Sequence, residues 1–221
     1  MSWWPASELL SQFQVWGRFY EATIAGTPER LRSHLELFPV GWKPAQAIDA
    51  PADLVVVMMN PGSSQPLPSM DSHRGFVPTR PDNTQYQILR LMLRAQAKGK
   101  PWRHARVVNL SDLRTPKSAE LFVKLGQYAR DPSHSIFSPS RHTELALAAG
   151  SGTTPVLRAW GLNPALQPWA ERALQALAGH PGLGISEGPA AFRHPLPQRA
   201  DLQKKWLDQV SAQIETSSAI P

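Results

Sequence analysis

An uninterrupted apolar run, Leu54 to Met59, limits the folds open to this chain. Such a run is typical of a strand that is buried on both faces of a parallel sheet. Shorter runs of the same character predict further strands at 106–110, 155–160 and 183–186. Helical patterns separate these runs, and this alternation predicts a parallel sheet with helices on both faces.

Amphipathic periodicity predicts the helices that accompany these strands. Apolar residues recur at helical spacing in 86–97, 117–127, 138–150, 163–179 and 199–214. The predicted fold class is therefore α/β, with three layers, α/β/α, and a mostly parallel four-stranded sheet in residues 46–221. A chain of 221 residues suits one such domain.

The first 45 residues carry a different pattern. In residues 6–24, Leu9, Phe13, Trp16 and Tyr20 fall on one helical stripe. Thr27-Pro28 has the form of an N-cap followed by proline at the first helical position, which predicts a second short helix. We therefore predict that residues 1–45 form an N-terminal helical extension packed on the core.

Composition excludes several classes of protein. The chain has no cysteine, which rules out disulfides, thiol nucleophiles and thiolate metal sites. It has no apolar stretch of about 18 residues, so no transmembrane helix is predicted. Because the N-terminus lacks the features of a secretory signal, we predict a cytoplasmic protein. Lys and Arg number 23 against 17 Asp and Glu, and this net charge of +6 admits a polyanionic partner such as nucleic acid.

Polar residues follow each predicted strand. Asn60 comes after the first strand, Asn109 ends the second, Gly161 follows the third and His194 follows the fourth. Ligands of parallel sheets bind beyond the carboxyl ends of the strands. Amide and imidazole groups gathered there suit a planar polar ligand such as a nucleobase. Each residue also has a plain structural interpretation: Asn60-Pro61-Gly62 is a turn signal, and His194 before a proline suits a cap.

Motifs for metals and phosphates are missing from the sequence. The histidines have no metal-ligand spacing, and there is no P-loop, no GxGxxG and no GxSxG. We therefore expect neither a metal nor a cofactor.

The order of the short motifs resembles the uracil-DNA glycosylase superfamily. Asn60-Pro61-Gly62-Ser63-Ser64 is similar to the first motif of its mismatch-specific branch, which includes thymine-DNA glycosylase-like enzymes. Gly75-Phe76-Val77-Pro78 resembles the loop whose aromatic residue stacks on a flipped base. Val108-Asn109-Leu110 resembles the strand whose Asn reads the base edge. Trp160-Gly161 matches a residue pair that is common in the middle of chains of this superfamily. His194-Pro195 matches the start of its second active-site motif.

A closer resemblance is to an uncharacterised bacterial and phage family with NPS or NPG, NL, AWG and HPL motifs. Ala159-Trp160-Gly161 and Arg193-His194-Pro195-Leu196 fit that pattern, and together the resemblances span about residues 53–215. One position departs from the glycosylase pattern, because Leu196 stands where a Ser usually helps to pinch the DNA backbone.

The resemblance implies a uracil-DNA glycosylase-like fold and a monofunctional DNA glycosylase that removes a deaminated or mismatched base. It implies Asn60 and His194 as catalytic residues, Asn60 positioning a water molecule and His194 donating to the base carbonyl. The base would contact Phe76, Asn109, Met59, Pro61 and Gly62. DNA would contact Ser63, Ser64, Arg74, Arg80, Arg193, Leu196, Gln198 and Arg199. The expected partner is DNA, and the expected state is a monomer.

Two other functions remain open at this point. The same pocket suits a hydrolase or transferase on free nucleosides or nucleotides, and the fold also suits a non-catalytic module that binds nucleic acid or protein. In a different hydrolase, one of the acidic residues close to the motifs, Asp71, Asp82 or Asp112, would be the catalytic base. Salt-sensitive affinity for DNA would distinguish the DNA glycosylase from an enzyme that acts on free nucleosides.

Overall fold

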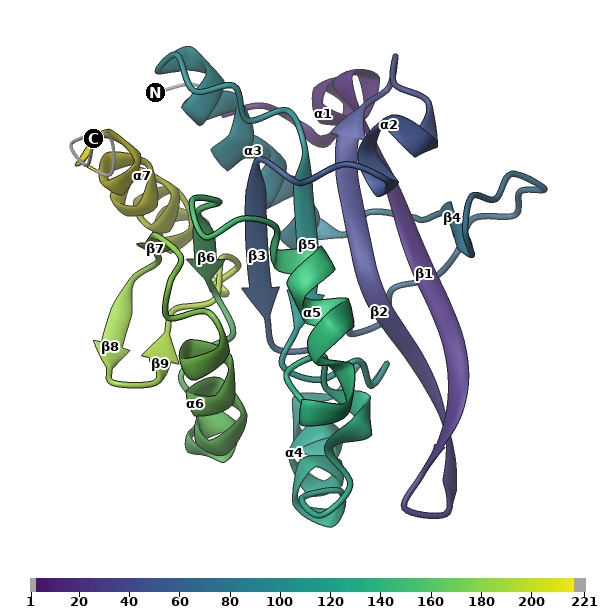
Figure 1. The fold of residues 1–221 in the computed structure, drawn as a ribbon. Helices are drawn as coiled ribbons and strands as arrows, with labels where there is room; N and C mark the ends of the chain where they lie inside the picture. The colour runs from purple at the N-terminus through teal and green to yellow at the C-terminus, as the bar shows by residue number, and fades with distance from the viewer. Residues whose placement is uncertain (1–2, 217–221) are drawn as a thin grey trace.

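The computed structural model describes residues 3–216, which form a central sheet with helices on both sides (Figure 1). The sheet has seven strands in the order β4-β1-β2-β5-β3-β6-β7. Their bounds are β1 Phe13–Ile24, β2 Thr27–Pro39, β3 Leu54–Met58, β4 Phe76–Pro78, β5 Ala105–Asn109, β6 Val156–Arg158 and β7 Gly182–Leu183. A separate two-stranded hairpin joins β8 Ser186–Gly188 to β9 Ala191–Phe192.

The parallel part of the sheet matches the sequence-based prediction. Strands β5, β3, β6 and β7 are adjacent and parallel, with Val56 of β3 facing Val107 on one side and Leu157 on the other. All five residues of β3 are buried, as the apolar run predicts. The α/β class is therefore confirmed, and the sheet is larger and more mixed than the four predicted strands.

The predicted N-terminal helical extension is wrong. Only α1, Ala6–Gln12, is helical before a long antiparallel hairpin of β1 and β2, and β2 pairs with β5. This hairpin extends the sheet on the side of β5, and Figure 1 shows it reaching beyond the ends of the other strands. The segment predicted as an added helical layer is therefore part of the central sheet.

Local chemistry explains why the hairpin forms. Residues 13–24 are rich in aromatic and β-branched side chains, which favour strands, although some of them also fall at helical spacing. Ala25 and Gly26 both have positive φ, 46° and 84°, as a two-residue hairpin turn requires. Pro28 lies near the start of β2, where the lack of an N–H is tolerated. The turn lacks the usual Asn-Gly signal, so the sequence did not reveal it.

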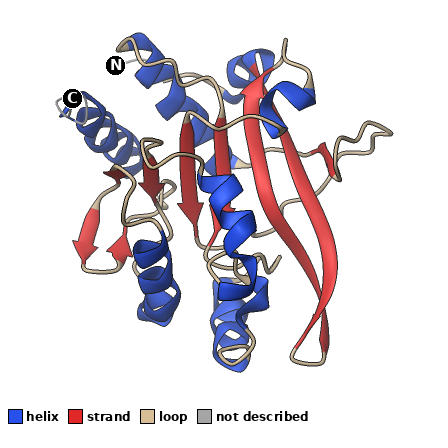
Figure 2. Ribbon diagram, in the orientation of Figure 1, coloured by secondary structure: helices blue, strands red, loops and turns tan. Residues whose placement is uncertain are grey.

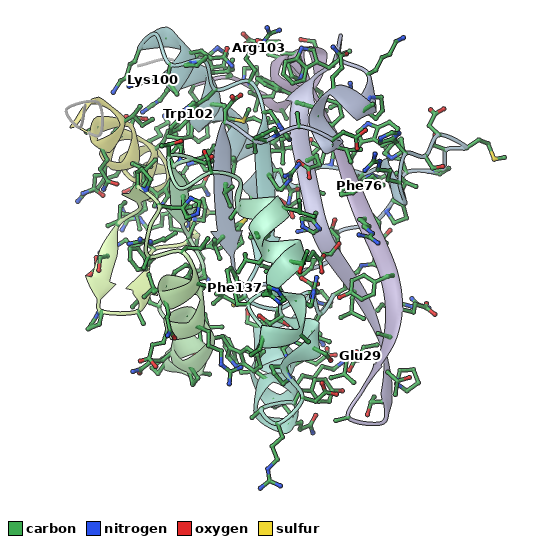
Figure 3. The ribbon with its side chains drawn as sticks, in the orientation of Figure 1. Glu29, Phe76, Lys100, Trp102, Arg103 and Phe137 are labelled. Carbon is green, nitrogen blue, oxygen red and sulfur yellow. The ribbon has the colours of Figure 1, made fainter. Side chains whose placement is uncertain are left out.

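The far end of the hairpin is fixed to the helical layer. Glu29, labelled in Figure 3, accepts hydrogen bonds from the Tyr128 hydroxyl at 2.6 Å and from Lys124 at 2.7 Å. Lys124 lies in α4, so this buried carboxylate joins β2 to that helix.

Helices cover both faces of the sheet, as Figure 2 shows. The helices are α1, α2 Pro44–Ile48, α3 Asn83–Ala97, α4 Ser118–Gln127, α5 His142–Ala149, α6 Gln167–Ala176 and α7 Ala200–Thr216, with short 3-10 turns at Pro132–His134, Pro139–Arg141 and Pro164–Leu166. Side chains of α1, α3 and α7 pack with Val56 on one face, whereas those of α4, α5 and α6 pack with Val57 on the other. Within residues 3–216, no helix is long and apolar enough to cross a membrane.

His134 lies in the core under α6, and its burial leads to a pH prediction. Its ring centroid is 4.7 Å from that of Trp169, and its Nδ1 is 3.0 Å from the Ser111 hydroxyl. Burial lowers the pKa of His134 to about 4, from an ordinary value of 6.5. Between these two values the unfolded chain binds more protons than the folded chain, so folding stability falls as the pH drops from 6.5 towards 4.

We expect His134 to contribute about 2–3 kcal/mol to the loss of stability between about pH 7 and pH 4.5. A His134→Gln variant should therefore show a flatter dependence of its urea midpoint on pH than the wild type. His142, which is exposed, provides the control, since His142→Gln should leave the wild-type dependence in place. Equal slopes in the wild type and His134→Gln would contradict the prediction.

Candidate functional site

A small cavity lies where β3 ends and α3 begins, and its volume is about 160 Å³. It gathers segments that are distant in the sequence: the end of β3 with its following turn, the start of α3, the 115–118 segment, one residue of β2, and His194. Its lining residues are Arg32, Met58, Met59, Asn60, Pro61, Gly62, Asp82, Thr84, Gln85, Thr115, Pro116, Ser118 and His194. The cavity is therefore at the carboxyl edge of the sheet, where the sequence predicts a site.

Asn60 is held by the loop that follows β5. Its Nδ2 donates to the backbone carbonyls of Leu113 and Thr115, at 3.1 and 2.9 Å, and to the Thr115 hydroxyl at 3.1 Å. These bonds fix which end of the amide is the oxygen, because only the nitrogen can donate. The amide is thus oriented with its Oδ1 free to accept a hydrogen bond.

His194 is held in a single tautomer. The backbone N–H of Leu196 donates to His194 Nδ1 at 3.2 Å, so Nδ1 must be the unprotonated nitrogen. Burial lowers the pKa of His194, which keeps the ring neutral at pH 7. A neutral ring with an accepting Nδ1 carries its proton on Nε2. His194 therefore offers one N–H donor.

Asp82 begins α3 and lines the same cavity. Its Oδ1 accepts the backbone N–H groups of Thr84 and Gln85, at 2.7 and 3.1 Å, so it is the N-cap of the helix. Its charge raises the pKa of both Arg32 and His194, against the larger lowering effect of their burial. The cavity thus contains a carboxylate as well as an amide and an imidazole.

Arg32 enters the cavity from β2. It is 1% exposed, and its backbone N–H donates to the Asp112 carbonyl at 2.9 Å. Within the described part of the chain, its Nε and Nη1 atoms are buried and have no hydrogen-bond partner. Burial lowers the pKa of Arg32 to about 10, so the guanidinium remains charged at neutral pH.

Five of the predicted residues meet in this cavity, and two of the others line a different one. Asn60, His194, Met59, Pro61 and Gly62 all line it. Phe76 and Arg74 instead line a separate cavity of about 460 Å³. Figure 3 shows Phe76 beside the β1–β2 hairpin.

The position of Phe76 follows from its secondary structure. It belongs to β4, which pairs with β1, and it packs in a buried cluster with Trp16 and Phe38. A strand residue of this kind is fixed in the core, whereas the sequence-based interpretation assumed a free loop. Arg74 forms an ion pair with Asp49 at 3.0 Å. The structure therefore does not bring a stacking aromatic from this segment to Asn60.

Asn109 ends β5 opposite Met58 and has no exposed surface. It does not line the cavity. Its side-chain oxygen and nitrogen are both buried, and neither has a partner among the described residues. Leu110 and Ser111, which follow Asn109, donate backbone hydrogen bonds to Met58 and Met59, so the chain after β5 continues alongside the end of β3.

None of the residues predicted to contact DNA lines this cavity. Ser63, Arg80, Arg193, Gln198 and Arg199 are exposed, Leu196 is half-buried, and Ser64 is buried. Arg193 pairs with Glu187, and Arg199 pairs with Asp201 at 2.8 Å. These partners reduce the charge available for phosphates, although exposed ion pairs are weak and readily exchanged.

A second, more apolar cavity adjoins the first at His194. Its volume is about 370 Å³, and its lining includes Trp206 and Ile185 together with the cationic Arg193 and Lys205. His194 lines both cavities, so it forms the boundary between a small polar chamber and a larger apolar one.

The sequence alone indicated neither Arg32 nor Gln85, and it offered Asp82 only as one of three acidic residues that could be the base of a different hydrolase. Arg32 was overlooked because the segment that begins at Thr27-Pro28 was predicted to be a short helix, and a helical Arg is ordinarily solvated. Asp82 carried a usable signal: Asp82 followed three residues later by Gln85 is a capping box at a helix start. In residues 3–216, no group of three or more His, Asp or Glu residues has the arrangement of a metal site.

No protein-family model matches this chain, and searches of the curated proteins and of the solved structures find no significant match.

Proposed function

We propose that this protein is a DNA glycosylase-like hydrolase that cleaves the N-glycosidic bond of a deaminated or mismatched base, of the uracil type, in DNA. The convergence of Asn60 and His194 on one cavity carries the proposal, because these residues come from the two motifs that resemble active-site motifs. We also propose that the parallel strands β5-β3-β6-β7 are the uracil-DNA glycosylase-like unit, since the motifs follow these strands.

The size of the cavity supports a single planar ring as its occupant. Pockets for drug-sized ligands usually measure about 300–1,000 Å³, and this cavity has about 160 Å³. Enzymes that act on a base in DNA extrude it from the stack into such a snug pocket. The deoxyribose and the backbone would then stay at the cavity mouth.

In the proposed reaction, a water molecule attacks C1′ of the deoxyribose while the C1′–N bond breaks. The Asn60 oxygen accepts a hydrogen bond from the water and orients it, because an amide is too weak a base to deprotonate it. The Asp82 carboxylate takes the proton, and the bonding electron pair leaves with the base as an anion. His194 Nε2–H donates to a base carbonyl as this charge develops. The released base takes a proton from solvent.

The test is alkali-induced strand cleavage of labelled oligonucleotides, both single- and double-stranded, that carry uracil, a G·T mismatch, hypoxanthine or xanthine. We expect product with one or more of these bases. We expect kcat to fall by about 10²–10³ in Asn60→Ala and in His194→Ala, since each variant removes an oriented polar group. His142→Ala, an exposed histidine outside the cavity, is the matched control.

Two results would count against the proposal. A folded wild-type protein that releases none of these bases would reject excision. Activity on free nucleosides with no salt-sensitive DNA affinity would favour the nucleoside hydrolase. Circular dichroism of each variant is needed, because Asn60 also holds the 113–115 loop through three hydrogen bonds.

A further inference from the structure

Arg32 is a buried cation, and two of its three side-chain nitrogens have no hydrogen-bond partner among the described residues. A guanidinium has five N–H donors and no acceptor. In Arg32 the buried Nε and Nη1 donate to no described residue, and no described carboxylate lies within ion-pair distance. Leaving charged donors buried and unpaired is costly, and buried polar groups in native proteins usually have partners. The open cavity is the place from which a partner can come, because Arg32 lines it.

The remaining groups of the cavity indicate the chemistry of that partner. His194 supplies a second N–H donor, as its bond from Leu196 requires. Both donors favour a ligand with acceptor oxygens on its rim. The amino groups of an aminated base would place N–H donors against the N–H donors of Arg32 and His194. An oxo base instead presents carbonyl oxygens, which accept their hydrogen bonds.

The charge balance of the proposed reaction also gives Arg32 a role. Before the reaction, the cavity holds the Arg32 cation and the Asp82 carboxylate. When Asp82 takes the proton of the water, it becomes neutral, and the departing base carries the negative charge. The negative charge has then moved from Asp82 to the base, and the Arg32 cation balances it in both positions. The net charge of the cavity stays constant, so no isolated charge is created in a buried site.

We propose that Arg32 recognises the substrate as an oxo base and stabilises that base as it departs as an anion. This inference rests on the proposed function and deepens it, because it names the substrate class of the same cavity. Arg32 is a catalytic residue in this proposal, since its N–H groups contact a carbonyl oxygen or the ring nitrogen of the leaving base.

The first arm of the test compares two leaving groups. Single-stranded oligonucleotides carry either uracil or 5-fluorouracil, whose electron-withdrawing fluorine makes it the better-stabilised anion. We expect Arg32→Met to lower kcat/KM by about 10²–10³ on uracil and by about tenfold less on 5-fluorouracil. Arg32→Lys keeps the charge without the planar fork and should lie between the wild type and Arg32→Met. If the excised base is a purine, hypoxanthine and the more acidic xanthine replace this pair.

A merely structural role for Arg32 gives a different result. Loss of packing would lower the rate on both bases by the same factor, and that outcome overturns the proposal. Wild-type rates for both bases in folded Arg32→Met would overturn it as well. If Arg32→Met does not fold, Arg32→Lys provides the comparison, because it retains the charge and most of the aliphatic stem.

The second arm does not depend on catalysis. Calorimetric titration measures the binding of free 5-fluorouracil below and above the pH at which it ionises. We expect the wild type to bind the anion at least tenfold more tightly than the neutral base, and Arg32→Met to lose this preference. This result without any excision would reject the proposed function and keep Arg32 as an anion site. Binding that is insensitive to ionisation and to Arg32 would overturn the inference even if excision is observed.

Discussion

Replacing Glu36 by alanine is expected to lower the free energy of unfolding by about 3–5 kcal/mol. Glu36 lies in β2, and its side chain is 1% exposed. Its Oε2 accepts a hydrogen bond from His104 Nε2 at 2.6 Å, and its Oε1 accepts one from Arg106 Nε at 2.7 Å. Burial alone would raise the pKa of Glu36, but the bond from His104 and the charge of Arg106 outweigh it and lower that pKa.

The loss is large because the partner groups stay buried. Arg106 faces Glu36 across the β2–β5 pair and also donates to the carbonyls of Ile48 and Ala50 at 3.3 and 3.1 Å. Without the carboxylate, a cation remains in the interior with only neutral acceptors. Removing one member of a buried pair costs more than the pair contributes, for this reason. Urea denaturation at constant pH measures the effect.

A surface ion pair in the same hairpin is the matched control. Glu21 and Arg30 are 3.7 Å apart, with side chains 79% and 78% exposed. Glu21→Ala should change the free energy of unfolding by less than about 1 kcal/mol. The double variant Glu36→Leu with Arg106→Met should recover part of the loss, because it removes both charges together. A Glu36→Ala variant as stable as Glu21→Ala would contradict the prediction.

The sequence predicts a strand or helix well where its residue pattern fits only one kind of secondary structure. The apolar run of β3 and the turn signal directly after it favour a short buried strand that ends at Asn60-Pro61-Gly62. In contrast, residues 13–24 carry aromatic side chains at spacings that suit a helix and a strand alike. Pairing of β1 with β2 and β4 decides between them, together with the pairing of β2 with β5, and pairing with segments distant in the sequence leaves no local signal.

The residues of the candidate site also differ in how well the sequence predicts them. Asn60 and His194 could be found because each follows a strand and stands in a short motif. Arg32 could not be found, since its importance depends on β2 lying beside the loop after β5. Phe76 was misplaced because a short strand, β4, draws it into the cluster around Trp16. A residue that reaches the site from a neighbouring strand distant in the sequence can be assigned to it only when the strand order is known.

Replacing Asp82 by asparagine is expected to lower kcat for base release by about 10²–10⁴ and to leave the fold unchanged. In the proposed reaction, Asp82 takes the proton of the attacking water, and an amide cannot do so. The substitution separates this chemistry from the structural role of the residue. Asp82 caps α3 through Oδ1, which accepts from Thr84 and Gln85, and asparagine caps helices about as well as aspartate does. The rate is measured in single-turnover experiments with the substrate that the wild type cleaves best.

Two control variants separate the proposed catalytic role of Asp82 from its role as a helix cap. Asp201 lies in the first turn of α7 and pairs with Arg199 outside the cavity, so Asp201→Asn should retain the wild-type rate. Asp82→Ala should lose both the rate and about 0.5–2 kcal/mol of stability, because alanine does not cap the helix. If Asp82→Asn keeps the wild-type kcat, the proton of the water goes to another acceptor. Asn60 alone then positions the nucleophile, while the Arg32 cation and the His194 donor lower the barrier on the leaving-group side.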